Sequence, residues 1–148
     1  MPGNLTFATT LEVRDSCLCL HAQRAARALA RQFDEAFRPL DLTSGQFSLL
    51  MALNRPEPPT MRQVAEVLAL DRTTLTANLK PVERRGWVSI LVGSIDRRSR
   101  MLLLTDAGHA KLAEALPLWR RTQAELHALL GDPGTARLCA DLRTLSDA

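Results

Sequence analysis

Cysteine is scarce in this 148-residue chain, which contains Cys17, Cys19 and Cys139. An odd number of cysteines with no C-x-x-C pair gives neither a disulfide framework nor the usual spacing of a zinc site. The N-terminal segment lacks the basic start and apolar stretch of a secretory signal. No apolar run approaches the ~18 residues of a membrane span. We therefore expect a single domain, residues 1–148, in the reducing cytoplasm, with no metal and no membrane.

Catalytic and cofactor motifs are missing from the sequence as well. The three histidines, His21, His109 and His127, lie far apart in the chain, and no glycine-rich phosphate loop occurs. Glu125 and His127 are two residues apart, so they face different sides of a helix. We expect no enzymatic activity, no catalytic residue and no cofactor.

Positive charge, in contrast, is concentrated in one block. The net charge is +3, and residues 60–100 hold eight Lys/Arg against four Asp/Glu, a local excess of +4. The remaining residues hold eleven basic and twelve acidic side chains, a net of −1. A localised basic excess is typical of proteins that bind a polyanion such as nucleic acid.

The apolar spacing predicts a mainly α-helical fold. Residues 11–38 should form one long helix that Pro39 ends, with a stripe at Leu18, Ala22, Ala25, Leu29, Phe33 and Phe37. Capping boxes, Thr43 with Gln46 and Thr60 with Gln63, should begin two shorter helices. A last pair of helices should follow Thr105, with a kink at Pro117 and a break near Gly131.

The middle of the chain predicts a helix-turn-helix. The turn is residues 69–71, and Asp71 should cap a helix that Gly86 ends. Leu75 and Leu79 can face a core while threonine, arginine and asparagine occupy the rest of the helix surface. Threonine is a poor choice for a solvent-facing helix interior, whereas Arg, Asn and Thr suit base edges in the major groove. We expect Pro81 to leave the first turns of this helix undisturbed.

Two short apolar runs after this helix predict a β-hairpin. Residues 87–92 and 100–104 flank a turn that holds Asp96, Arg97 and Arg98. Arginines on a projecting ribbon can enter the minor groove, and Asp96 is placed to orient one of them by a salt bridge. The sequence thus predicts a small antiparallel wing with a basic tip.

From Thr43 to Gly108 the chain resembles the MarR family of bacterial winged helix-turn-helix regulators. The resemblance rests on the segments Leu42-Thr-Ser-Gly-Gln-Phe, Val64-Ala-Glu-Val-Leu, Asp71-Arg-Thr-Thr-Leu-Thr, Val82-Glu-Arg-Arg-Gly-Trp-Val, Asp96-Arg-Arg-Ser-Arg and Leu104-Thr-Asp-Ala-Gly. It implies a homodimeric repressor with winged helix-turn-helix residues 40–108 and dimerisation helices in residues 11–38 and 105–146. Its partner would be a roughly palindromic double-stranded DNA operator. The expected DNA-contacting residues are Arg62, Arg72, Thr73, Thr74, Thr76, Asn78, Lys80, Arg97, Arg98 and Arg100.

The resemblance leaves the inducing signal open. A small aromatic or lipophilic effector could bind near Phe47 and Met51. Alternatively, Cys19 resembles the reactive cysteine of the organic-peroxide sensors, and Cys139 could resolve its sulfenic acid. The chain has no tyrosine, which that branch uses to hold the reactive thiol. A winged helix that binds a protein partner is a further alternative, and DNA affinity that falls with salt would distinguish the two.

Overall fold

The computed structural model describes Gly3 and residues 5–148 of the chain. It is mainly α-helical with a two-stranded antiparallel sheet, as the sequence predicts. The elements in chain order are α1 Phe7–Ser16, α2 Leu18–Phe37, a 3-10 turn η1 Arg38–Leu40, α3 Ser44–Leu53, α4 Met61–Leu68, α5 Arg72–Arg84, β1 Val88–Val92, β2 Arg100–Leu104, α6 Asp106–Leu130 and α7 Gly134–Ser146. None of the described helices is both long enough and apolar enough to cross a bilayer.

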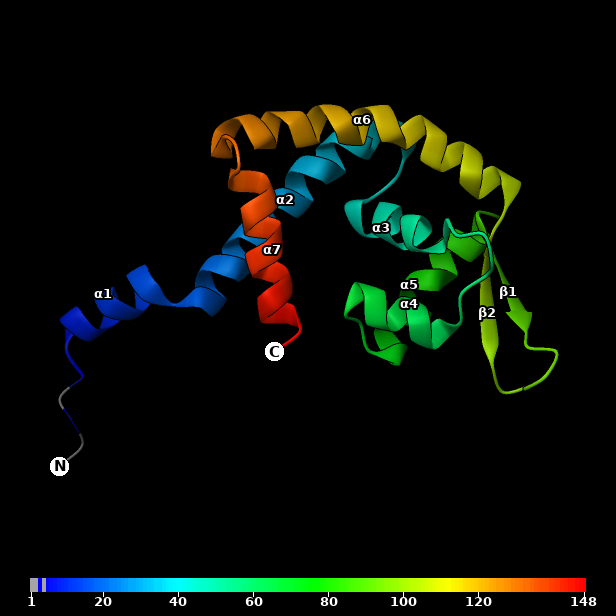
Figure 1. Ribbon diagram of the computed structural model, residues 1–148, viewed down its shortest axis with the longest axis horizontal. Coiled ribbons are helices and arrows are strands. Elements are labelled where there is room, and N and C mark those ends of the chain that lie inside the picture. The colour runs from blue at the N-terminus through cyan, green and yellow to red at the C-terminus, as the bar shows by residue number, and fades with distance from the viewer. Residues whose placement is uncertain (1–2, 4) are drawn as a thin grey trace.

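Two long helices, α2 and α6, cross each other above the smaller elements (Figure 1). Helices α3 to α5 and the wing lie below α6, and the hairpin projects away from it (Figure 1). The long helices therefore form one part of the molecule and the helix-turn-helix with its wing forms another. Helix α6 runs through Pro117 without interruption and arches rather than breaking (Figure 1).

The expectation of one helix over residues 11–38 is wrong at its N-terminal end. The helical segment begins at Phe7 and is interrupted at Cys17, whose backbone is extended. Cys17 then caps α2, because its Sγ accepts a hydrogen bond from the Leu20 amide at 3.5 Å. Helix α1 has no fully buried side chain.

Both predicted capping boxes form. Thr43 and Gln46 exchange hydrogen bonds at the start of α3, and Thr60 and Gln63 do the same at the start of α4. Each box satisfies amides that an isolated helix end would leave unpaired. Ala69 ends α4 in the left-handed region with φ 52°, and this tight turn delivers the chain directly to α5.

The core lies where α3, α4 and α5 meet the wing and the two long helices. Its side chains are the buried apolar residues Phe37, Leu42, Phe47, Leu49, Leu50, Leu53, Val64, Leu75, Leu79, Val82, Trp87, Val88, Leu102, Leu104, Leu112 and Ala115. At the start of α6 the packing is so close that a Cβ added to Gly108 would lie 2.3 Å from the Trp87 carbonyl oxygen. The position therefore requires glycine.

Candidate nucleic-acid interface

Helix α5 presents one apolar and one polar face. Leu75, Leu79 and Val82 are buried, and they fix the helix against the core. The predicted polar residues of this helix are all exposed, namely Arg72, Thr73, Thr74, Thr76, Asn78 and Lys80. The helix therefore offers a polar surface of about three turns to a partner.

Two of the threonine hydroxyls on this helix are already hydrogen-bonded. The Thr74 hydroxyl donates to Asp71 Oδ2 at 2.9 Å, and the Thr76 hydroxyl donates to the Arg72 carbonyl at 2.8 Å. Both residues are exposed, so their methyl groups remain for apolar contact, for instance with a thymine methyl. Asn78 lies toward the α3 side of the helix, where it lines a small groove of about 180 Å³.

The wing is a regular hairpin with a hydrogen-bonded tip. Strand β1 pairs with β2 from Val88 opposite Leu104 to Val92 opposite Arg100. The Leu102 amide also donates to the Pro59 carbonyl at 2.9 Å, which joins the loop before α4 to the wing. Sequence patterns missed this contact because Pro59 carries no strand signal.

The salt bridge expected for Asp96 is not the interaction that this side chain makes. Its Oδ1 accepts a hydrogen bond from the backbone amide of Arg98 at 2.9 Å, so the carboxylate shapes the turn. Asp and Asn commonly bond the backbone two residues ahead in this way. Arg97 and Arg98 are exposed at the tip.

Two other predicted DNA-contacting arginines have partners within the protein. Arg100 Nη1 donates to the carbonyls of Arg97 at 2.8 Å and Ser99 at 3.3 Å, beneath the wing tip. Arg62, on α4, forms an exposed ion pair with Glu66 at 3.4 Å. Arg100 therefore supports the shape of the wing, and Arg62 lies outside both the reading helix and the wing.

No protein-family model matches the chain. Two curated relatives from Bacillus subtilis are each 31% identical over 91 residues, which is 62% of this chain. They are the HTH-type transcriptional regulator YwoH and the organic hydroperoxide resistance transcriptional regulator. The chain covers 66% and 62% of their lengths, just under two thirds of each.

Solved structures match over almost their whole length. The Mycobacterium tuberculosis regulator MosR bound to DNA is 39% identical, with 89% of this chain and 95% of that chain covered and a TM-score of 0.81. The repressor CouR on a 23-mer DNA duplex is 30% identical, with 97% and 99% covered and a TM-score of 0.81. Escherichia coli MarR on operator DNA is 25% identical, with 90% and 96% covered and a TM-score of 0.80.

The chain belongs to the MarR family. This confirms the resemblance read from the sequence, and the protein is a DNA-binding transcriptional regulator of the winged helix-turn-helix type.

Two exposed arginines at the C-terminal end of α5, Arg84 and Arg85, are not among the residues that the sequence analysis predicted to contact DNA. Arg84 follows Thr73, Ala77 and Lys80 at the spacing i, i+4, i+7 and i+11, which places all four on one helix face. Arg85 was also missed, and its contacts with Asp41 depend on an approach across 44 residues of sequence.

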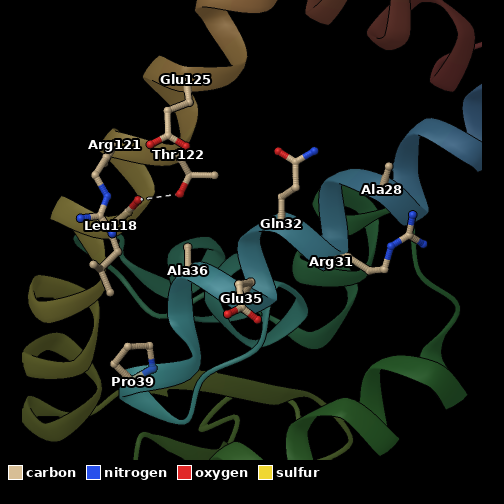
Figure 2. A pocket seen from close by; sticks show the side chains of 10 residues that line it. All are labelled: Ala28, Arg31, Gln32, Glu35, Ala36, Pro39, Leu118, Arg121, Thr122 and Glu125. Carbon is tan, nitrogen blue, oxygen red and sulfur yellow. Dashed lines mark hydrogen bonds between the residues drawn. The ribbon is translucent and has the colours of Figure 1, made fainter.

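Phe47 and Met51, which the sequence analysis predicted near an effector, belong to the hydrophobic core or pack against it. Phe47 is buried between Phe37 and Trp119, with ring centroids 4.8 and 6.5 Å away, and Met51 packs against the same core. A cleft of about 800 Å³ lies elsewhere, between α2 and α6 (Figure 2). Gln32 and Thr122 face it from opposite helices, and Arg121 stands on the α6 wall (Figure 2).

The three cysteines form no disulfide. Cys19 is exposed on α2, where the Gln23 amide donates to its Sγ at 3.3 Å, and Cys139 is exposed on α7. Cys17, at the α1–α2 break, is half-buried. The residues that the structure describes contain no cluster of three His, Cys, Asp or Glu side chains fit to hold a metal ion.

Proposed function

We propose that this MarR-family protein represses transcription by binding a roughly palindromic operator as a homodimer in the bacterial cytoplasm. The observation that carries the proposal is the placement of the exposed polar face of α5 beside a wing with Arg97 and Arg98 at its tip. An α-helix fits the major groove, which is about 12 Å wide, and the wing can reach the neighbouring minor groove.

The long helices supply the surface for a second copy. Apolar side chains remain exposed along α2, α6 and α7 in the single chain, and they are Leu18, Leu29, Leu129, Leu130, Leu138, Leu142 and Leu145. Five of these leucines line an apolar groove of about 350 Å³ between the three helices, namely Leu29, Leu129, Leu130, Leu138 and Leu142. Contiguous exposed apolar surface of this kind marks an interface. Dimer symmetry then implies two half-sites about one helical turn apart.

Within each half-site the residues divide by chemistry. Arg72 and Asn78 carry the groups that pair bidentately with guanine and adenine, so they determine base preference. Lys80, Arg97 and Arg98 act mainly on phosphates or on groove potential, which fixes the register without reading sequence. The helix N-terminus adds amides that can contact a phosphate.

Selection of duplexes from a random-sequence library tests this function. We expect the purified protein to enrich a single inverted repeat, and sedimentation with that duplex should give two protein chains per site. Enrichment of an asymmetric site, or of no site, would contradict a dimeric operator-binding repressor.

The α2–α6 cleft is the candidate site for an effector that releases DNA. CouR, 29% identical to this chain, has been solved with p-coumaroyl-CoA, an aromatic thioester that carries anionic phosphates. Arg31 and Arg121 line the cleft together with Glu35 and Glu125, and among the described residues no carboxylate forms an ion pair with Arg121, so its guanidinium remains for an anionic group. Leu118, Ala36 and Pro39 supply apolar wall for an aromatic part. We therefore expect an aromatic ligand with an anionic group.

Release of a labelled operator by a panel of aryl carboxylates and aryl-CoA thioesters tests the effector. A compound that releases DNA from the wild type should act at a higher concentration on Arg121→Gln, with Arg120→Gln, an exposed arginine of α6 outside the cleft lining, as the matched control. Equal sensitivity of wild type and Arg121→Gln would remove the cleft as the effector site.

A thiol switch is the second candidate for the signal. It is favoured by Cys19, which is exposed at the beginning of α2 two residues from Cys17. A hydroperoxide would oxidise the Cys19 thiolate to a sulfenic acid and leave as the alcohol. A second thiol, Cys139 as the sequence suggests or the nearer Cys17, would then form a disulfide and release water.

Peptide mass mapping after one equivalent of cumene hydroperoxide distinguishes these partners. The switch predicts loss of operator binding that dithiothreitol restores and that Cys19→Ser abolishes. Unchanged binding by the oxidised wild type would exclude it and leave the effector as the signal.

A further inference from the structure

Arg85 makes three contacts at the end of the reading helix. Its Nη1 donates to the Asp41 carbonyl oxygen at 2.5 Å, and its Nη2 forms an ion pair with the Asp41 carboxylate. Its guanidinium carbon lies 4.3 Å from the centroid of the Trp87 ring. Arginine can make such a fork and stack on a ring at once, whereas lysine cannot.

These contacts join elements that belong to different parts of the molecule. Asp41 follows η1, the turn at the end of α2, and its backbone has a left-handed φ of 52° that exposes its carbonyl to Arg85. Trp87 begins the wing, and its carbonyl accepts a hydrogen bond from the Thr105 amide at 3.0 Å. The Thr105 hydroxyl donates to the Gly86 carbonyl at 2.6 Å, and its oxygen caps α6 by accepting a hydrogen bond from the Gly108 amide. The contacts of Arg85 with Asp41 and Trp87, named here the elbow, thus connect α5 to both long helices.

We propose that Arg85 is a positioning residue for DNA binding, which fixes the orientation of the reading helix relative to the dimerisation helices through the elbow. This rests on the proposed dimeric operator binding. Two reading helices can enter successive major grooves together only at one separation, about 34–36 Å. Rotation of either winged unit at its elbow would change that separation, and the stiffness of the elbow determines how much of the free protein is ready to bind.

The geometry distinguishes this role from a contact with DNA. The guanidinium nitrogens of Arg85 already contact Asp41, and the plane of the guanidinium lies over the Trp87 ring. The Arg85 side chain is 31% exposed. The Asp41 side chain is 92% exposed, so the pair contributes little to the core. Losing the elbow should therefore change the orientation of the winged unit relative to the long helices more than it changes the free energy of unfolding of the protein.

The test uses the operator selected by the wild type and a series of duplexes whose half-site spacing differs by single base pairs. Arg85→Met keeps an apolar chain over Trp87 but loses the fork. We expect it to bind the optimal duplex roughly tenfold more weakly, within the range of typical coupling effects. Its spacing profile should be flatter than that of the wild type, and its salt slope should not change.

Asp41→Asn is a second variant, since asparagine tolerates the left-handed backbone while losing the carboxylate. It should flatten the profile in the same direction but by less, because the Asp41 backbone carbonyl still accepts from Arg85 Nη1. Asp41→Asn/Arg85→Met should be no weaker than Arg85→Met, because the two residues act as one unit. Arg38→Met is the matched control. It removes an equal charge from the same turn, where Arg38 pairs with Glu35, and should bind like the wild type.

Thermal unfolding accompanies each variant, and Asp41→Asn decides alone if Arg85→Met does not fold. A wild-type affinity and spacing profile in these variants would overturn the proposal. So would a salt slope reduced by about one phosphate contact, which would make Arg85 a DNA ligand. If the wild type itself selects no duplex, the proposed function has failed rather than this inference.

Discussion

Oδ1 of Asp71 lies 2.7 Å from the backbone nitrogen of Thr74, and Oδ2 lies 2.9 Å from the Thr74 hydroxyl. One carboxylate therefore accepts both bonds and caps the first turn of the reading helix. The hydrogen bond from the Thr74 backbone is the main reason that the pKa of Asp71 is lowered from its usual 3.8. This relationship links the order of the first reading turn to the charge on Asp71.

The sign of the resulting pH dependence follows from the lowered pKa. Folding favours the ionised form of Asp71, because the pKa of this carboxyl is lower in the folded protein than in the unfolded chain. The resulting stabilisation of the folded protein is complete above pH 3.8, the unfolded value, and is lost as the pH falls through the lower pKa of the folded state. We expect Asp71→Asn, which can still cap a helix, to remove this acid-sensitive part, while Asp71→Ala destabilises the protein at neutral pH as well. Urea unfolding across an acid pH series measures both, and identical pH profiles for wild type and Asp71→Asn would contradict the assignment.

Gly108 should be intolerant of a side chain. The added Cβ of Gly108→Ala would lie 2.3 Å from the Trp87 carbonyl oxygen and 2.6 Å from Leu104 Cδ1. Forcing the start of α6 away from Trp87 and β2 should lower the free energy of unfolding by about 1–3 kcal/mol. Gly45→Ala is the control in α3, where the nearest atom to a Cβ is 4.0 Å away. It should be neutral or stabilising, and equal losses for both variants would show that the close approach is unimportant.

Base preference should depend on the reading helix more than on the wing. Arg72→Ala or Asn78→Ala should weaken binding to the selected operator and reduce discrimination at one base pair, since a bidentate pair contributes about 1–3 kcal/mol. Lys80→Ala should weaken all duplexes alike. Competition binding against single-substitution duplexes gives the profile. A profile for Arg72→Ala that matches the wild type would remove Arg72 from base reading.

Arg100 should act on the shape of the wing. Arg100→Gln loses the bonds to the Arg97 and Ser99 carbonyls, and we expect weaker DNA binding with only a small change in salt slope. Arg97→Ala should lower the slope by about one contact. Binding isotherms at several salt concentrations compare the two variants, and a full unit of slope lost in Arg100→Gln would make it a phosphate ligand instead.

Local signals made much of this fold predictable. The capping boxes at Thr43 and Thr60 and the glycine after α5 determine where helices begin and end, and all three form as the sequence indicates. The break at Cys17 carries no proline or glycine to mark it. The apolar spacing of the sequence therefore could not predict this break.

The missed features of the site depend on tertiary contacts. Asp96 could equally have bonded a side chain or the backbone, and only the turn geometry decides for the Arg98 amide. The sequence alone does not distinguish Arg85 from the other basic residues of the block, because its partner Asp41 is 44 residues away in sequence and approaches it only in the folded protein. Whether each exposed arginine meets DNA is likewise a property of the complex and not of the spacing in the sequence.

The most direct measurement of the central claim is the binding of the purified protein to duplex DNA from upstream of its own gene, titrated with salt, beside Arg97→Ala/Arg98→Ala. The winged helix-turn-helix account predicts tight binding that weakens steeply as salt rises, with affinity and slope both reduced in the double variant. Binding that is indifferent to salt, or undiminished in the double variant, would contradict it.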